Sequence, residues 1–188
     1  MSTSPSADSL ASVAQHFAQS GPAPVHLWTP DFCGDLDMRI ARDGTWFYLG
    51  SPIGRLPLVR LFSTILKREG DDYFLVTPVE KVGIQVEDVP FIAVDFELEN
   101  GVMTFETNVG DHLRLGPENP MWLAHDESGQ PLPYIRVRAN LDARIDRKSF
   151  YRLVDMASPH MVDGESWVGI WAMGAFFAFM REQDIYRK

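Results

Sequence analysis

The chain is poor in cysteine, in positive charge and in long apolar runs. Cys33 is the single cysteine of 188 residues, so no disulfide can form within the chain and a reducing compartment is favoured. The 17 Lys and Arg are outnumbered by 26 Asp and Glu, and a net charge of −9 argues against a nucleic-acid binder. The longest apolar run, 167–180, is shorter than the roughly 20 residues of a membrane-spanning helix. These shortages, with the lack of a basic residue before Arg39, predict a cytoplasmic protein with neither nucleic-acid nor membrane partners.

Signatures of common catalytic and cofactor sites are lacking as well. The glycine-rich stretch 50–54 is not followed by the Gly-Lys-Ser/Thr of a P-loop, and no GxGxxG motif occurs. Gly164-Glu-Ser166 is not followed by the second glycine of a nucleophile elbow. The five histidines have no ligand-like spacing, which argues against a metal site. We therefore expect no cofactor and no metal, and a non-enzymatic role is favoured.

The residues that are present suit a soluble globular fold with an uneven charge distribution. Hydrophobic residues make up 45% and charged residues 23% of the chain. Residues 87–111 hold seven acidic and no basic side chains, whereas 136–152 hold six basic and two acidic ones. A basic island on an acidic protein can select a compact anion. Alternatively, the two stretches neutralise each other across a sheet.

In the first half of the chain, hydrophobic periodicity predicts helices and strands. A short helix is expected from Asp8 or Ser9 as its cap to Gly21 as its stop. Residues 37–40 alternate as a strand, with Met38 and Ile40 on one face and Asp37 and Arg39 on the other, and Asp43-Gly44 is expected to turn a hairpin. Apolar residues at helical spacing from Leu58 to Leu66 predict a second helix, closed by Gly70. Two short strands, 73–76 and 82–86, are expected to follow.

The second half shows the clearest alternation. Asn100-Gly101 is expected to join two strands, and residues 135–145 alternate as one long strand or a bent pair. Asp146 is expected to cap the helix that follows. Residues 110–133 are rich in turn formers and predict an irregular connection. Residues 167–180, broken by Gly169 and Gly174, predict two bent apolar strands.

Both halves share an order of strand, helix and paired strands, which predicts duplication. We expect an α+β fold of two strand–strand–helix–strand–strand units. The predicted organisation is an N-terminal tail and short helix at 1–21, an N-terminal α+β domain at 22–90 and a C-terminal α+β domain at 91–188.

Several segments together resemble a known bacterial family. In chain order they are Gly50-Ser-Pro-Ile53 with Arg55, Leu58-Val59 with Leu61-Phe62, Tyr73 to Lys81, Val86-Glu-Asp88 with Pro90-Phe91, Tyr134-Ile-Arg-Val-Arg138 with Asn140, and Phe150-Tyr151. In this order and spacing the segments resemble the bacterial domain of unknown function family 1285.

That resemblance implies a duplicated α+β protein whose C-terminal half is similar to a pleckstrin-homology-like domain. It also implies a ligand site between the halves, for a nucleotide-type molecule, and a role in signal transduction. The family has no established enzymatic activity, so the resemblance assigns no catalytic residue.

Polar residues near strand ends in the first half form one group of candidate ligand-binding residues. Thr77, Glu80 and Lys81 follow a strand, and Pro78 turns the chain, so these three side chains can converge on a polar ligand. Alternatively, Thr77 satisfies the turn and Glu80 pairs with Lys81 or Arg55. Arg55 precedes a helix, whose first unpaired N–H groups attract anions.

A second candidate group lies in the strongly alternating stretch. Arg136, Arg138 and Asn140 fall on its polar face, where successive side chains are about 6.6 Å apart. Arginines at this spacing can hold a phosphate through forked hydrogen bonds. The alternative is ion pairing with Glu97 or Glu106 of a neighbouring strand.

We therefore expect a cytoplasmic ligand-binding or regulatory module that binds a small phosphorylated or nucleotide-type molecule. An enzyme with Glu80 or Asp88 as general base is one alternative. Another is a protein-interaction module, because the aromatic tail 167–179 can pack as core or leave an exposed remainder for a homodimer interface. The predicted ligand-binding residues are Arg55, Thr77, Glu80 and Lys81 from the first half and Arg136, Arg138 and Asn140 from the second.

Overall fold

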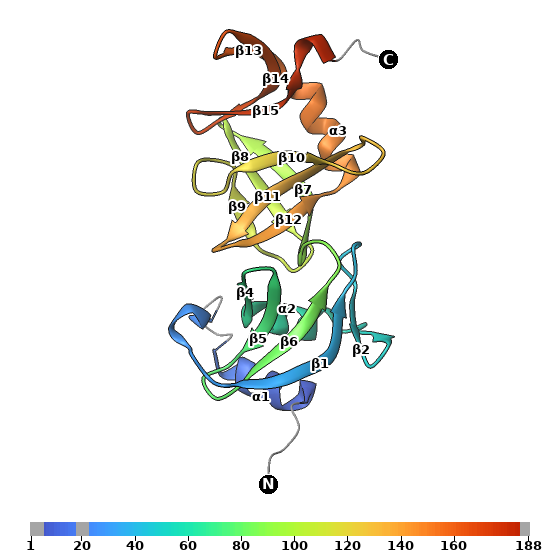
Figure 1. Ribbon diagram of the computed structural model, residues 1–188. Helices are drawn as coiled ribbons and strands as arrows, with labels where there is room; N and C mark the ends of the chain where they lie inside the picture. The colour runs from blue at the N-terminus through green and yellow to red at the C-terminus, as the bar shows by residue number, and fades with distance from the viewer. Residues whose placement is uncertain (1–5, 18–22, 185–188) are drawn as a thin grey trace. The chain divides into compact units, whose positions relative to one another are not determined.

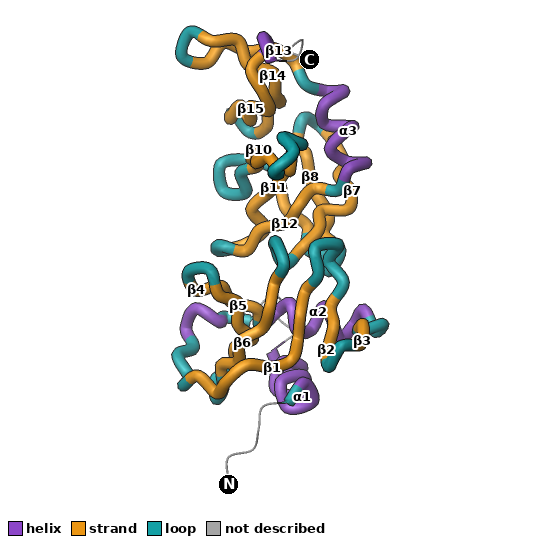
Figure 2. The backbone as a smooth tube through the Cα atoms, turned by 45° about the vertical axis from the view of Figure 1, so that its right-hand side comes forward, coloured by secondary structure: helices purple, strands orange, loops and turns teal. Residues whose placement is uncertain are grey.

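Figure 1 shows the computed structural model of the chain, which describes residues 6–17 and 23–184. The chain divides into two units, Met1–Pro90 and Phe91–Lys188. A six-stranded sheet lies in each unit, and both sheets curl (Figures 1 and 2). Each unit therefore has its own sheet and its own buried apolar side chains.

The N-terminal unit combines its sheet with two α-helices among the described residues. In chain order its elements are α1 (Ala7–Phe17), η2 (Val25–Leu27), β1 (Phe32–Ile40), β2 (Trp46–Tyr48), β3 (Ser51–Pro52), α2 (Leu56–Thr64), β4 (Leu66–Glu69), β5 (Asp72–Val76) and β6 (Lys81–Val86). The strand order is β3-β2-β1-β6-β5-β4. The central pair, β1 and β6, is parallel and the other neighbours are antiparallel.

The core of this unit forms between one face of the sheet and the helices. Met38 and Ile40 of β1 are buried, whereas Asp37 is exposed and Arg39 is half-buried, which confirms the predicted alternation. Phe62 of α2 stacks on Trp46 of β2 with ring centroids 6.4 Å apart. Opposite the core, the outer face of the sheet carries the charged side chains of Lys67, Glu69 and Lys81 together with the ring of Phe74.

The helix α1 begins earlier than its sequence predicts. It starts at Ala7, and the Ser6 hydroxyl accepts a hydrogen bond from the Ser9 backbone N–H at 3.3 Å. The predicted caps, Asp8 and Ser9, therefore lie inside the first turn. The predicted stop at Gly21 lies outside the described residues.

The second helix is shorter than predicted. It ends at Thr64, and Leu66 begins strand β4, where it pairs with Leu75. The hydroxyls of Ser63 and Thr64 donate to carbonyls of the preceding turn, at 2.7 Å each, and help to close the helix. Leu66 is buried at the start of a strand and Ile65 in the turn before it, so the apolar spacing alone could not distinguish this arrangement from a longer helix.

The C-terminal unit contains a second six-stranded sheet, one α-helix and a three-stranded sheet among its described residues. In chain order its elements are β7 (Phe91–Glu99), β8 (Val102–Thr107), β9 (His112–Arg114), β10 (Met121–His125), β11 (Pro131–Arg138), β12 (Leu141–Ile145), α3 (Arg147–Met156), β13 (Ser158–Val162), β14 (Glu165–Ala172), β15 (Ala175–Arg181) and η3 (Glu182–Asp184). The strand orders are β10-β11-β12-β7-β8-β9 and β13-β14-β15.

Four predicted features of this unit are confirmed. Asn100-Gly101 joins β7 to β8, and the long alternating stretch is a bent pair, β11 and β12. Asp146 caps α3, its carboxylate accepting the Ser149 backbone N–H at 2.8 Å. The apolar tail forms the two strands β14 and β15, which turn at Gly174.

The prediction of an irregular connection over 110–133 is wrong. Strands β9 and β10 lie within it and pair with β8 and β11. The turn formers are confined to the links between these strands, as at Asp126, whose carboxylate accepts the N–H groups of Ser128 and Gln130 at 2.9 Å each. With three and five residues, β9 and β10 are too short to show the alternation of apolar and polar residues that predicts a strand. Pairing with the neighbouring strands of the sheet determines their conformation.

The two six-stranded sheets have the same topology, which confirms a duplicated α+β fold. In each, two three-stranded antiparallel meanders meet along a parallel pair formed by the first and last strands, β1 with β6 and β7 with β12. The helix differs in position: α2 joins the two meanders, whereas α3 follows the last strand. The resemblance of the C-terminal half to a pleckstrin-homology-like domain is not confirmed.

Within residues 6–17 and 23–184, no helix is both long and apolar enough to cross a membrane. The cytoplasmic location stays a prediction.

Candidate functional site

The turn between β5 and β6 is built around Thr77. Its side chain is fully buried, and its hydroxyl accepts the Glu80 backbone N–H at 3.2 Å. The Thr77 backbone N–H in turn donates to the Glu80 carbonyl at 2.9 Å. The Glu80 carboxylate accepts a hydrogen bond from the Ser9 hydroxyl of α1 at 3.4 Å. Thr77 thus satisfies the turn, as the structural alternative predicts, while Glu80 contacts α1 and not Lys81 or Arg55.

Lys81 takes part in an ion-pair network on the outer face of the sheet. Its Nζ lies 2.9 Å from Oε2 of Glu69, and Nζ of Lys67 lies 3.0 Å from Oε1 of the same carboxylate. The hydrogen bond from Lys81, followed by that from Lys67, lowers the pKa of Glu69 below its ordinary value. Lys81 also lies over the ring of Phe74, 4.7 Å from its centroid. Its charge is therefore largely compensated.

Arg55 occupies the N-cap position of α2 and is exposed. Its side chain makes no capping hydrogen bond, and the first turn of α2 contains no acidic residue. The carbonyl of Arg55 accepts the N–H groups of Leu58 and Val59. This geometry leaves the guanidinium accessible to solvent.

The other predicted residues lie in the C-terminal unit, along the hairpin of β11 and β12. Arg136 pairs with Asp142, which is 5% exposed, and its Nη1 donates to the Ala139 carbonyl at 3.0 Å. Arg138 pairs with Asp111 and lies over the ring of Phe91, 4.9 Å from its centroid. Both arginines are thus compensated by acidic groups.

Two details of this hairpin differ from the expected alternative. The carboxylates that pair with Arg136 and Arg138 are those of Asp142 and Asp111, instead of Glu97 or Glu106. Asn140 is exposed in the two-residue turn of the hairpin. The role of these three residues in ligand binding stays a prediction.

Lys81 lines a pocket in the N-terminal unit, and none of the other six predicted residues lines that pocket. This pocket has a volume of about 340 Å³ and is lined by residues of β1, β5 and β6. These three strands are labelled in Figure 1. We call the pocket the Gly83 pocket. Its aromatic rings are those of Phe32 and Phe74, its charged groups come from Asp35, Asp72 and Lys81, and its remaining lining comes from Tyr73, Gly83 and Ile84.

The centre of the Gly83 pocket is determined by strand pairing. Gly83 of β6 pairs with Asp35 on one side and with Phe74 on the other. A Cβ atom placed on Gly83 would lie 2.1 Å from Oδ1 of Asp35 and 3.7 Å from Cε2 of Phe32. The Phe32 and Phe74 rings meet edge to face with centroids 6.1 Å apart. The absent side chain therefore leaves room for a carboxylate beside two aromatic rings.

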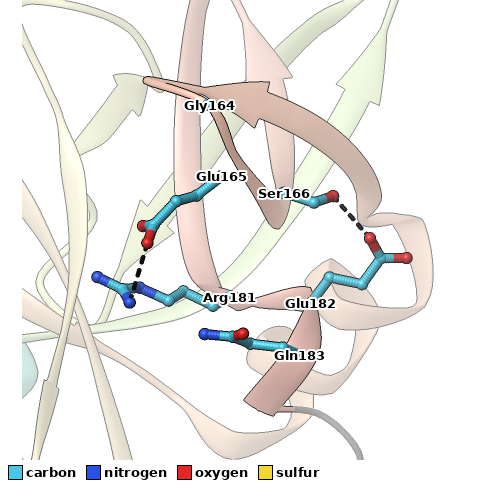
Figure 3. A pocket seen from close by; sticks show the side chains of 6 residues that line it. All are labelled: Gly164, Glu165, Ser166, Arg181, Glu182 and Gln183. Atoms are coloured by element: carbon cyan, nitrogen blue, oxygen red, sulfur yellow. Dashed lines mark hydrogen bonds and ion pairs between the residues drawn. The ribbon is translucent and has the colours of Figure 1, made fainter.

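Two other pockets are less suited to an organic ligand. One, of about 470 Å³, lies at the ends of β14 and β15, and Figure 3 shows its polar lining. There Arg181 pairs with Glu165 at 3.1 Å and the Ser166 hydroxyl donates to Glu182 at 2.6 Å. It has no aromatic or aliphatic wall. The other, of about 100 Å³ beside Asp95, is smaller than the 300–1,000 Å³ usual for ligand pockets.

The sequence indicated Lys81 but missed the other lining residues of the Gly83 pocket. One signal was available: Gly83 lies inside a strand, where glycine weakens pairing and often marks a close approach. Asp35 and Phe32 gave no signal, because the predicted alternation began only at Asp37 while β1 begins at Phe32. Their position beside Gly83 depends on the parallel pairing of β1 with β6, which local patterns do not reveal.

The described residues offer no clear centre for metal or acid–base chemistry. Among residues 6–17 and 23–184, no group of three or more His, Cys, Asp and Glu side chains is arranged to hold a metal ion. Glu80 and Asp88, the two proposed general bases, do not line any of the three pockets above.

Comparisons with known proteins agree with the duplicated architecture. Residues 23–89 match the model of the N-terminal domain of DUF1285, a domain of unknown function, and residues 90–179 match that of the C-terminal domain of DUF1285 proteins. The crystal structure of a DUF1285 family protein from Silicibacter pomeroyi DSS-3 is 55% identical, with a TM-score of 0.84, over 94% of this chain and 97% of that one.

A second solved structure, of a DUF1285 family protein from Shewanella baltica OS155, is 32% identical with a TM-score of 0.55. The match covers 64% of this chain and 91% of that one. No curated protein matches the chain significantly. On the two domain matches and the structural relative of near-equal length, the chain belongs to the DUF1285 family of proteins of unknown function.

Proposed function

We propose that this protein is a non-catalytic, regulatory ligand-binding module and that a small organic molecule binds in the Gly83 pocket. The observation that carries the proposal is the pocket itself. Its volume of about 340 Å³ lies in the range of natural ligand sites. Two aromatic rings and a few charged groups line it, which is the usual composition of a site that binds through apolar contact and orients through polar contact.

A nucleotide-type molecule, the ligand that the sequence suggests, remains within the proposal. A flat base can pack against the ring of Phe32, which is 55% exposed although it is aromatic. Lys81 could donate to a phosphate, but its ammonium group already bonds Glu69. The compensated charges of Arg136 and Arg138 likewise reduce the support for an anion at the second predicted group. A role in signal transduction is part of the proposal as the purpose of such binding.

The test is thermal unfolding and calorimetric titration of the full chain with a panel of nucleosides, nucleotides and small amines. A bound ligand at about 100 times its Kd adds roughly 2.7 kcal/mol. For a protein of this size, that corresponds to an increase of about 5–10 °C in Tm. Phe74→Ala should abolish the increase, because it removes a wall of the pocket.

The matched control is Tyr151→Ala, which removes an aromatic ring that is 59% exposed and lies outside the pocket. It should leave the ligand effect intact. A panel that moves neither Tm nor the heat of titration would leave the proposal without support, as would a ligand that Phe74→Ala binds with unchanged affinity.

A protein-interaction module that forms a homodimer is the second candidate, and one observation favours it. Trp171, Met161 and Met173, on or beside the three-stranded sheet, are each more than half exposed, which is unusual for large apolar side chains. Sedimentation at increasing concentration would detect a dimer. Trp171→Ser should weaken it, and a monomer at all concentrations would argue against this candidate.

A further inference from the structure

We propose that the Gly83 pocket selects a ligand that carries a protonated amine beside a flat apolar group, with the Asp35 carboxylate as its counter-ion. The inference rests on the proposed function, because it names the chemical class of the ligand for that pocket. It assigns the charge of the ligand, which the family matches leave open.

The first support is the reason for glycine at position 83. Gly83 does not have the positive φ that requires glycine, unlike Gly70 in the turn before β5. A glycine in the interior of a strand costs stability because it has a large conformational entropy and no side chain to pack. The space that it leaves is occupied by Oδ1 of Asp35, which would be 2.1 Å from a Cβ. Gly83 therefore admits a carboxylate to the floor of the pocket.

The second support is the balance of charge around the pocket. Lys81 is compensated by Glu69 at 2.9 Å. Within residues 6–17 and 23–184, neither Asp35 nor Asp72 forms an ion pair. Lys67 shares the Glu69 carboxylate with Lys81, so these two lysines, Glu69, Asp35 and Asp72 together carry a charge of −1. This balance, with the carboxylate of Asp35 at the centre of the pocket, favours a cation over a phosphate.

The third support is the aromatic lining. A cation held between a carboxylate and a ring gains from both the ion pair and the ring quadrupole, as Lys81 over Phe74 already illustrates on this face. The exposed ring of Phe32 offers a surface for the apolar part of a ligand. A metal ion is a poorer occupant, because the described residues hold no group of three or more His, Cys, Asp and Glu side chains that could bind one.

The experiment compares three probes that share a phenyl group and differ in charge. They are 2-phenylethylamine, 2-phenylethanol and 3-phenylpropionate, titrated into the full chain while the Gly83 amide signal is followed by NMR. Adenosine and AMP are titrated in the same way. We expect the amine to bind with the lowest Kd and the propionate to bind most weakly.

Asp35→Asn should raise the Kd of the amine about five- to tenfold, because it removes the charge and keeps the shape. Asp37→Asn is the matched control, because Asp37 is exposed on the same strand but does not line the pocket. This variant should bind the amine with the Kd of the wild-type chain. Gly83→Ala should also weaken amine binding, since the new methyl group displaces the Asp35 carboxylate. Circular dichroism of each variant checks that it folds.

The outcomes separate this inference from the proposed function. If the alcohol, the propionate or AMP binds at the Gly83 amide as tightly as the amine, the charge assignment is wrong and the pocket remains a ligand site. An equal effect of Asp35→Asn and Asp37→Asn likewise overturns the assignment. If no probe moves the Gly83 signal, the proposed function of the pocket fails, and the inference fails with it.

Discussion

Acidic side chains on this protein compensate most of the basic groups that could otherwise bind an anion. The clearest case is Arg136, whose partner Asp142 is 5% exposed and lies on the adjacent strand. A buried carboxylate needs such a partner, because leaving it unpaired costs several kcal/mol of desolvation. The sequence predicted Arg136 on the polar face of a strand. Pairing of β11 with β12 brings Asp142 to that face as its counter-ion.

At this scale we predict the effect of Asp142→Asn. The substitution removes a charge-assisted hydrogen bond to Arg136 and should lower the free energy of unfolding by about 1–3 kcal/mol. Urea denaturation measures it. Glu99→Gln, an exposed charge loss on β7, is the control and should change stability by less than about 0.5 kcal/mol. If Asp142→Asn is as stable as the wild type, the ion pair does not stabilise the fold, and the prediction that Arg136 binds a ligand is strengthened.

Among the secondary-structure elements, the pairing of β14 with β15 depends on a close backbone approach. Gly169 lies within β14, beside an irregularity in register between Val168 and Gly169. A Cβ at this position would lie 2.1 Å from the Phe177 carbonyl oxygen and 2.9 Å from Cα of Ala178. These are backbone atoms, so they cannot move aside without disturbing the pairing of the two strands. The predicted break of the apolar tail at Gly169 is a bulge inside one strand, and the chain turns only at Gly174.

We therefore predict that Gly169→Ala destabilises the three-stranded sheet. Overpacking of this kind costs about 1–3 kcal/mol. Hydrogen exchange of the amides in β14 and β15 should become faster, and urea denaturation should shift to lower concentration. Gly54→Ala is the matched control, because a Cβ there meets nothing within 4 Å and should be tolerated. Unchanged exchange in the Gly169→Ala variant would contradict the close approach.

At the scale of the whole molecule, acidic groups in both units have lowered pKa values. The pKa values of Asp43, Glu69, Glu87, Asp95 and Asp126 all lie below their ordinary values. The causes are hydrogen bonds: the Asp95 carboxylate, for example, accepts the Phe96 backbone N–H first and the Arg152 guanidinium second. Groups of this kind couple stability to pH across the entire chain.

We predict that the protein loses stability in acid. The folded pKa of each group is lower than its ordinary value, which is 3.8 for Asp and 4.5 for Glu. Their contribution is therefore present above about pH 4.5 and is lost as the pH falls through the folded pKa. Urea denaturation from pH 6 to pH 2.5 should show the decline, and Glu69→Gln combined with Asp95→Asn should make it shallower. A stability that stays constant or rises over this range would contradict the prediction.

Local patterns in the sequence determined the elements whose conformation depends only on residues close to one another in the chain. The hairpin at Asn100-Gly101, the Asp146 cap, the alternation of β1 around Met38 and the paired strands of the apolar tail were all predictable, because turn chemistry, capping and strand period act over a few residues. Family membership was also predictable from the order and spacing of the motifs.

Only the tertiary structure decided which segments lie side by side. The end of α2 at Thr64 and the strands within 110–133 depend on partners along the sheet, since their residues suit more than one conformation. The Gly83 pocket depends on the parallel pairing of β1 with β6, which brings Asp35 over Gly83 from 48 positions away in the chain. Contacts at such distances follow from burial of the whole sheet against its core, so the sequence alone determined Lys81 as a candidate and the fold determined its neighbours.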